Sequence, residues 1–262
     1  MLGRRPLLAL GCGAYLAFAF LQFPASTAYR WFAPADVVLS GISGTVWSGR
    51  AALGSVGGLA LRDLEWRVSP LPLLIGRLST DASAQLPDGF VNASVSATMS
   101  TLRFTNLELA TSLETIAQVL PLGGARGTLS VDLDELTLRD GWPVSAAGVV
   151  RLRRLEVPPL VPGSGSSSVL LGDYELSSFE LADLRLGASL RDTGGPLEVV
   201  GTVAVDLQAP RSLDGAAPSF DGRVRERADV PNMLREPLEF LTVDVDAEGW
   251  RTLDLDPWLQ QL

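Results

Sequence analysis

The chain has 262 residues, of which 47% are hydrophobic, and it carries a net charge of −9. It contains no histidine and no lysine, so all 21 of its basic residues are arginines. These absences exclude Ser-His-Asp catalysis, histidine-ligated zinc, the lysine of a phosphate-binding loop and Schiff-base chemistry, and the negative charge argues against a nucleic-acid-binding surface, which needs a basic patch.

The N-terminal residues predict a membrane segment. Residues 1–6 form a short tail with two arginines, and residues 7–23 form an uncharged apolar run. At about 1.5 Å per helical residue, this run nearly spans a hydrocarbon core of roughly 30 Å. We predict a transmembrane anchor over 7–23 and a membrane-proximal linker over 24–40. A cleaved signal peptide is the alternative, because small residues follow the run at 25–28.

Both interpretations export the rest of the chain. Arg4 and Arg5 favour a cytoplasmic N-terminus under the positive-inside rule, which predicts a single-pass inner-membrane protein with a periplasmic C-terminal domain. The single cysteine, Cys12, lies inside the apolar run. The exported part therefore has no disulfide and depends on a hydrophobic core for its stability.

The stretch 44–78 predicts two strands joined by a glycine turn. In the second strand, the alternation of apolar and polar residues shifts by one position. In the second strand, apolar residues alternate up to Leu61 and again from Leu64, but on the opposite parity. The intervening pair, Arg62 and Asp63, shifts the phase by one residue. A β-bulge absorbs such a shift while one face of the strand stays apolar.

The same phase shift recurs four times further along the chain. The residue pairs at its centre are Thr105 and Asn106, Asp134 and Glu135, Arg153 and Arg154, and Ala182 and Asp183. Chance in a leucine-rich chain is one explanation. We favour repeated bulges that bend a long sheet, so that Leu61 and Leu64 point to the same side, as do Leu133 and Leu136.

The predicted fold class is all-β: a long curved antiparallel sheet, half-barrel or groove-like, with short helices and one preceding transmembrane helix. The helix candidates are 71–75, with Ser69 as the cap and Pro70 as the first position before it, and 111–120, where Thr111 and Glu114 fit a capping box. Residues 158–168 are rich in Pro, Gly and Ser and predict a loop or linker. We interpret this segment as a hairpin loop within one periplasmic domain, 41–262.

No catalytic, cofactor-binding or metal site is predicted, and we expect no enzyme activity. Acidic residues recur, but they alternate with apolar residues on strands and so line a solvated face. Ser48 lacks the second glycine of a nucleophile elbow and has no histidine partner.

The residues GTVWSGRA at 44–51 and LRDLEWRVSPLPLLIGRL at 61–78 resemble the N component of the bacterial type II secretion machinery, also called the general secretion pathway. This resemblance implies one inner-membrane segment and a periplasmic β-rich domain. It also implies an accessory role in moving folded proteins across the outer membrane, with other secretion components as partners. The resemblance implies no catalytic residues.

Three residues of the first strand pair are candidates for an interaction site. We hypothesise that Trp47, Arg50 and Trp66 form or support a contact surface, because Trp and Arg dominate interface hot spots. The alternative is that both tryptophans are core anchors.

Two other functions stay open. The first is a periplasmic lipid-handling groove anchored in the inner membrane, with lipid as a partner of the apolar sheet face. The second is a hydrolase, which would need two convergent buried carboxylates roughly 5–9 Å apart.

Overall fold

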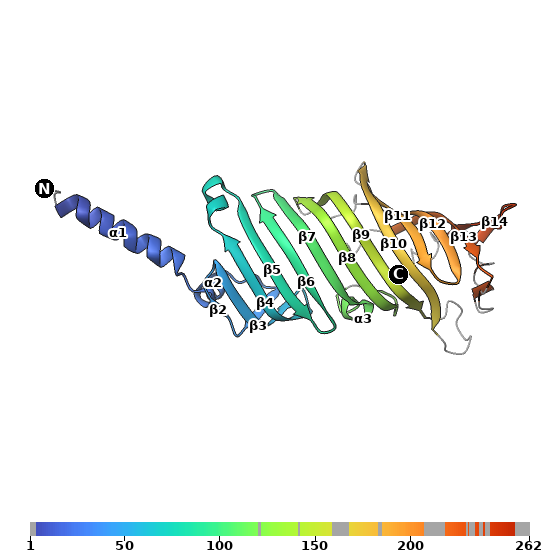
Figure 1. Cartoon of the computed structure of the whole chain (residues 1–262), viewed down its shortest axis with the longest axis horizontal. Helices are drawn as coiled ribbons and strands as arrows, with labels where there is room; N and C mark the ends of the chain where they lie inside the picture. The colour runs from blue at the N-terminus through green and yellow to red at the C-terminus, as the bar shows by residue number, and fades with distance from the viewer. Residues whose placement is uncertain are drawn as a thin grey trace.

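The computed structural model describes residues 4–119, 122–140, 142–158, 168–182, 185–206, 218–228, 230, 234–235, 238 and 242–254. Its main feature is one long open antiparallel sheet, accompanied by few helices (Figure 1). The predicted all-β fold class with a long antiparallel sheet is confirmed.

The sheet contains 15 strands formed by the described residues, and most of them pair with their neighbours in the chain. Strands β1 and β2 both pair with β3, β3 to β13 pair in sequential order, and the far edge runs β13–β15–β14. The strands are β1 (Val37–Ser40), β2 (Ser43–Gly44), β3 (Ser48–Val56), β4 (Leu59–Ser69), β5 (Leu78–Leu86), β6 (Gly89–Ala97), β7 (Thr101–Ser112), β8 (Arg126–Arg139), β9 (Trp142–Val157), β10 (Val169–Ala182), β11 (Arg185–Gly194), β12 (Leu197–Asp206), β13 (Pro218–Glu226), β14 (Thr242–Val245) and β15 (Arg251–Asp254).

The N-terminal helix α1 (Arg4–Leu21) extends away from one end of the sheet, and α2 (Ala25–Phe32) connects it to the first strands (Figure 1). The apolar run is therefore helical as far as Leu21. Within the part of the chain that the structure describes, no helix has both the length and the apolar character needed to cross a membrane. The transmembrane anchor over 7–23 stays a prediction.

Register shifts between neighbouring strands identify the predicted bulges. Strand β4 has one more residue than β5 between Arg62 and Glu65, and Asp63 within it has a φ of 47°. Strand β7 has one more residue than β6 across Asn106, whose φ is 51°. The left-handed backbone at these positions takes the extra residue out of the ladder without inverting the side chains that follow.

Two further predicted bulges are confirmed in β8 and β9. Strand β8 has an extra residue relative to β9 between Leu133 and Glu135. Strand β9 has an extra residue at Arg153 and Arg154 relative to both of its neighbours, and the φ of Arg154 is 50°. Four of the five predicted pairs are thus sites of bulges.

The pair Ala182 and Asp183 behaves differently. Asp183 lies outside the described residues, and Ala182 pairs with Arg185 at the β10–β11 hairpin. The apolar pattern that suggested a bulge here spans the end of the β10–β11 ladder, where the chain reverses direction between two antiparallel strands. Two register shifts between β10 and β11 lie earlier, at Asp173/Tyr174 and at Ser177/Glu180, and Ser178 in the second has a φ of 53°.

Strand pairing shows that the bulge of β7 keeps one apolar face. Strand β6 pairs with β5 without a shift, so Val91 and Val95 lie on the same face. Leu109 pairs with Val91, and Phe104 pairs with Val95, on opposite sides of the Asn106 bulge. Because directly opposite residues share a face, both flanks of the bulge face the same way.

The same orientation continues into β8. Leu107 pairs with Leu133, and Phe104 pairs with Leu136. Since Leu107 and Phe104 share a face, Leu133 and Leu136 also point to the same side, as predicted.

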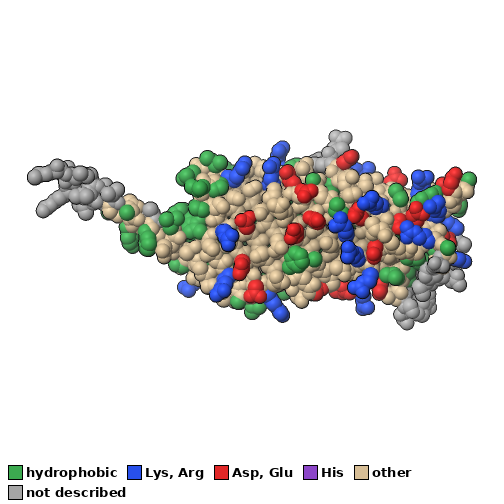
Figure 2. Space-filling view, viewed as in Figure 1, with side chains coloured by type: hydrophobic (Ala, Val, Ile, Leu, Met, Phe, Trp, Pro, Cys, Tyr) green, Lys and Arg blue, Asp and Glu red, His purple; other side chains and the backbone are tan. Residues whose placement is uncertain are grey.

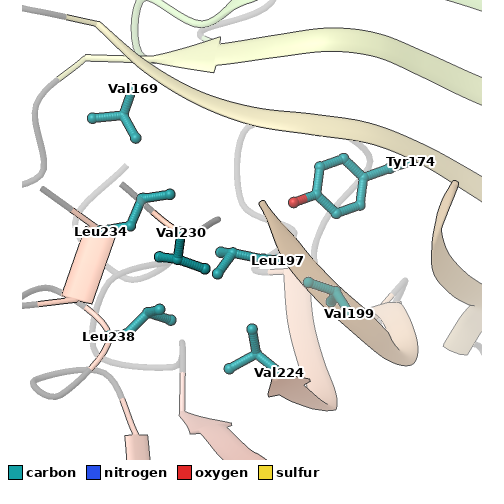
Figure 3. Close-up of a cluster of buried hydrophobic side chains, with 8 residues drawn as sticks. All are labelled: Val169, Tyr174, Leu197, Val199, Val224, Val230, Leu234 and Leu238. Atoms are coloured by element: carbon teal, nitrogen blue, oxygen red, sulfur yellow. The ribbon is translucent and has the colours of Figure 1, made fainter. Parts of the chain in front are cut away.

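Two hydrophobic clusters lie on the sheet. In the N-terminal half, Leu61, Ala84 and Leu86 are buried and Leu64 packs against them, so Leu61 and Leu64 face the same side, as predicted. The cluster at the C-terminal end joins β10, β12 and β13 to residues 230, 234 and 238 (Figure 3). Its buried members are Val169, Tyr174, Leu197, Val199, Val224, Val230, Leu234 and Leu238.

The predicted helix 111–120 is wrong in its start and length. Helix α3 covers only Leu113–Ile116, and Ser112, not Thr111, is its N-cap, accepting a hydrogen bond from the Thr115 amide at 3.1 Å. Thr111 is instead a buried residue of β7, because its hydroxyl donates to the Asp88 carboxylate at 2.8 Å. The other short helix, η1, covers Leu71–Ile75 as predicted, but its N-cap is Pro70 and not the predicted Ser69.

Candidate functional site

The three candidate residues lie close together in the first strands, but they have different surroundings. Trp47 precedes β3, Arg50 is in β3 and Trp66 is in β4. Arg50 pairs with Glu65, and its neighbour Gly49 pairs with Trp66. Because successive residues of a strand face opposite sides, Arg50 and Trp66 point to opposite faces of the sheet.

Trp47 connects the N-terminal helix to the sheet. Its indole nitrogen donates a hydrogen bond to the main-chain carbonyl of Phe20 at 2.9 Å. The Trp47 and Phe20 rings also contact each other, with their centroids 4.7 Å apart and their planes tilted by 59°. The backbone amide of Val46 adds a second link, since it donates to the carbonyl of Phe23 at 3.0 Å.

Trp66 packs across the first strand pair. Its indole nitrogen donates to the carbonyl of Val46 at 3.2 Å. A Cβ atom placed on Gly49 would lie 2.4 Å from the Trp66 ring, so the ring covers this glycine closely. These contacts favour the interpretation of Trp66 as a packing anchor of the first strands.

Arg50 is exposed and borders a polar hollow of about 620 Å³. Its Nε donates to the Ser43 hydroxyl at 3.3 Å. The hollow extends from β2 and β3 across to β7, and its lining residues are Ser43, Gly44, Ser48, Gly49, Arg50, Glu65, Trp66, Arg67, Asp81, Ala82, Ser83, Asn92, Ala93, Ser94, Asn106 and Glu108.

A transverse row of polar residues crosses this hollow. Strand pairing places Arg50 opposite Glu65, Glu65 opposite Ser83, Ser83 opposite Asn92, and Asn92 opposite Glu108. Five strands thus contribute one residue each to the same face. Sequence reasoning missed this row, because each strand alone shows only a solvated polar face.

The hollow presents charges of both signs. Arg50 and Arg67 lie among the carboxylates of Glu65, Asp81 and Glu108. Asp81 accepts a hydrogen bond from the Ser94 hydroxyl at 2.6 Å, and Glu108 accepts one from the Asn92 amide at 3.4 Å. A surface of this composition suits a partner with complementary mixed charges, because positive and negative groups then each find a counterpart.

Helix α3 is held by a cluster outside the hollow. Asp88, in the β5–β6 turn, accepts hydrogen bonds from the hydroxyls of Thr111 and Thr115, each at 2.8 Å, and from the Ser112 amide at 3.1 Å. Partial burial opposes ionisation of Asp88, but these hydrogen bonds, with one from the Ser112 side chain, outweigh it and lower its pKa to about 2. Each donor belongs to the β7–α3 junction, so the cluster has a structural role.

Strand β10 carries a buried carboxylate that accepts hydrogen bonds from two arginines. Glu175 is 7% exposed and accepts hydrogen bonds from Arg191 Nε and Arg151 Nε, each at 3.0 Å. The Arg191 hydrogen bond, aided by Arg151, lowers the pKa of Glu175 in spite of its burial. The carboxylate therefore ties together β9, β10 and β11.

A second carboxylate nearby faces the other side of the sheet. Asp192 accepts hydrogen bonds from the Val199 amide at 2.9 Å and from Arg227 at 2.5 Å. It pairs with Tyr174, whereas Glu175 pairs with Arg191, so Asp192 and Glu175 point to opposite faces. Their opposed orientation does not provide the convergent pair of carboxylates that a hydrolase needs.

The apolar face of the sheet is filled at its C-terminal end. The side chains of Val230, Leu234 and Leu238 pack against those of Leu197 and Val224 there (Figure 3). This packing counts against a lipid groove that runs along the whole sheet.

Metal ligands do not gather in the parts of the chain that the structure describes. No group of three or more His, Cys, Asp or Glu residues in them is arranged to hold a metal ion. That the protein uses no metal and no cofactor stays a prediction.

Comparison with known proteins gives two similarities. A family model described as "Type II secretion system (T2SS), protein N" matches residues 35–254. A relative from Aeromonas hydrophila, named "Type II secretion system protein N", is 25% identical over 245 residues, which are 90% of this chain and 91% of the relative. No solved structure matches.

Proposed function

The chain belongs to the type II secretion system protein N family, and we propose that it is an accessory inner-membrane component that acts through protein–protein contacts during export of folded proteins across the outer membrane. Its partners under this proposal are other components of the same machinery. The absence of histidine and lysine and the opposed buried carboxylates support a role without catalysis.

The proposed location is the inner membrane. Residues 7–23 form the anchor, with the N-terminus in the cytoplasm and the sheet in the periplasm. A reporter that is active only in the periplasm should work when it is fused after residue 262 and fail when it is fused before residue 4. The reverse pattern would contradict the proposed orientation.

The proposed contact surface is the polar hollow, and the observation that carries it is the position of Arg50. This exposed arginine of β3 lines the hollow, and Trp47, which precedes β3, is hydrogen-bonded to the N-terminal helix. A partner bound in the hollow would therefore be held close to the membrane. Trp47 and Trp66 support the surface from behind by fixing the strands that form it.

The test compares Arg50→Ala with a matched control, Arg139→Ala, which removes an exposed arginine outside the hollow. Removal of a hot-spot arginine costs about 1.4 kcal/mol or more, equivalent to about tenfold in affinity. We expect Arg50→Ala to reduce secretion and the recovery of partner components in a pull-down, whereas the control should behave as wild type. If Arg50→Ala keeps both activities while circular dichroism shows an intact fold, the contact proposal fails.

A further inference from the structure

The tip of the β4–β5 hairpin exposes a compact apolar cluster. Leu71, Leu74 and Ile75 of η1 are 76%, 84% and 80% exposed. The segment 68–76 contains no charged residue. Exposure of three large aliphatic side chains together is unfavourable in water and marks an interaction site.

The backbone of this tip is well defined by its own hydrogen bonds. The Gly76 amide donates to the carbonyl of Leu73, and the Arg77 amide donates to that of Pro72, each at 3.0 Å. Gly76 ends the turn with a φ of 71°, and Pro70 begins it. The apolar side chains are thus presented outward by a structured turn that two prolines stiffen.

The tip lies at the same end of the molecule as the N-terminal helices. Figure 1 shows the β4–β5 hairpin tip at the upper edge, and α2 at the lower edge, of the end of the sheet from which α1 leaves, and Figure 2 shows hydrophobic side chains gathered at this end. Helix α2 also exposes Trp31 and Phe32 at this end. Tryptophan and other aromatic residues are typical of membrane–water interfaces.

We propose that η1 is a second membrane contact, which inserts Leu71, Leu74 and Ile75 into the interface of the bilayer that α1 enters. This inference rests on the inner-membrane location in the proposed function. Arg77, exposed beside the tip, would meet anionic lipid headgroups. A lipid surface is the favoured occupant because the tip is aliphatic and uncharged, and because exposed aromatic residues at the same end suit the same interface.

A second contact would have a mechanical consequence. A single helix leaves a domain free to swing about its linker, whereas two contacts on one plane fix the tilt of the sheet. The polar hollow would then be held at one height and orientation above the membrane.

The test places a nitroxide label on the full chain in vesicles of phosphatidylethanolamine and phosphatidylglycerol. Cys12→Ala removes the native thiol, and Leu74→Cys or Val200→Cys supplies the new one. Val200 is the matched control, since it is 51% exposed and lies on β12, at the opposite end of the sheet. Collision rates with oxygen, which dissolves in lipid, and with a water-soluble nickel chelate report the depth of the label.

We expect the label at Leu74 to collide with the nickel chelate at least several-fold less often than the label at Val200, while its collisions with oxygen stay frequent. Equal nickel accessibility at the two positions would overturn the inference. Loss of both oxygen and nickel collisions at Leu74 would also overturn it, because a protein surface would then cover the tip.

A third label separates this inference from the proposed location. In the wild-type chain, a label on the native Cys12 reports on α1. Lipid exposure at Cys12 with an aqueous Leu74 would refute the second contact and leave the anchor standing. Aqueous behaviour at both positions would refute both.

Discussion

The indole nitrogen of Trp47 donates a hydrogen bond at 2.9 Å to the carbonyl of Phe20, which lies 27 residues earlier in the chain. Carbonyl groups in the last turn of a helix lack a partner within the regular helical ladder. The Phe20 carbonyl accepts from the Phe23 amide at 3.3 Å and also from the Trp47 indole. Together with the ring contact between Trp47 and Phe20, the indole hydrogen bond fixes where the helix meets the first strands.

We therefore expect Trp47→Ala to loosen the junction and speed tryptic cleavage after Arg30, an exposed residue of α2. Trp47→Phe should have an intermediate effect, because it keeps an aromatic ring but loses a hydrogen bond with a net contribution of about 0.5–1.5 kcal/mol. Limited proteolysis followed by mass spectrometry measures the cleavage rate. An unchanged rate in Trp47→Ala would show that the contact does not restrain the helix.

The left-handed backbone at Asp63 predicts an unusual response to substitution. At a φ of 47°, a β-branched residue is strained, so Asp63→Val should reduce the free energy of unfolding by about 1–3 kcal/mol. Arg62→Val, one residue earlier, should stay within about 0.5 kcal/mol, and Asp63→Gly should be tolerated. Urea unfolding gives these values, and equal losses at 62 and 63 would argue against the bulge.

A single methyl group added at Gly89 should strongly destabilise the fold. A Cβ atom added there would lie 1.8 Å from the carbonyl oxygen of Ala110, which belongs to the adjacent strand. Gly89→Ala should therefore cost about 3 kcal/mol or more, because backbone must move to accept it. Gly187→Ala is the matched control, since its nearest neighbouring atoms are 3.8 Å away, and thermal unfolding should separate the two variants clearly.

Removal of the negative charge of Glu175 should lower the stability of the fold. Glu175→Gln leaves Arg151 and Arg191 facing each other without a carboxylate between them. We expect a loss of about 1–3 kcal/mol, the range for hydrogen bonds to charged groups. Glu180→Gln, an exposed change on the same strand, should have little effect, and similar losses in both variants would contradict a special role for Glu175.

The contribution of Glu175 to stability should depend on pH. The pKa of Glu175 is lower in the folded protein than its usual 4.5, chiefly through the Arg191 hydrogen bond. Its stabilising contribution is therefore present above the usual pKa and is lost as the pH falls through the lowered value. The stability difference between wild type and Glu175→Gln should shrink as the pH is lowered from about 7 to about 3. A constant difference would exclude this linkage.

Local sequence was sufficient for the features that depend on side-chain alternation. The parity switch between Leu61 and Leu64 correctly predicted the bulge at Asp63, because only one face of an exported sheet is buried and each phase shift must be absorbed by the backbone. The residues at 44–51 and 61–78 likewise sufficed to suggest the family, which the family model confirms over residues 35–254.

The same local reasoning failed at the β10–β11 hairpin. The apolar pattern around Ala182 and Asp183 did not reveal that the chain reverses direction there. The capping signal at Thr111 was overridden by Asp88, 23 residues earlier, which holds the Thr111 hydroxyl and keeps this residue in β7.

Only the tertiary structure decided how the residues of the polar face are arranged. Arg50, Glu65, Ser83, Asn92 and Glu108 form one row because four consecutive strand pairings place them opposite each other. Each register depends on turns and bulges elsewhere in the strands, and a shift of one residue would turn a member of the row to the other face. The alternation of each strand is a local property, whereas the hollow is a product of all the registers together.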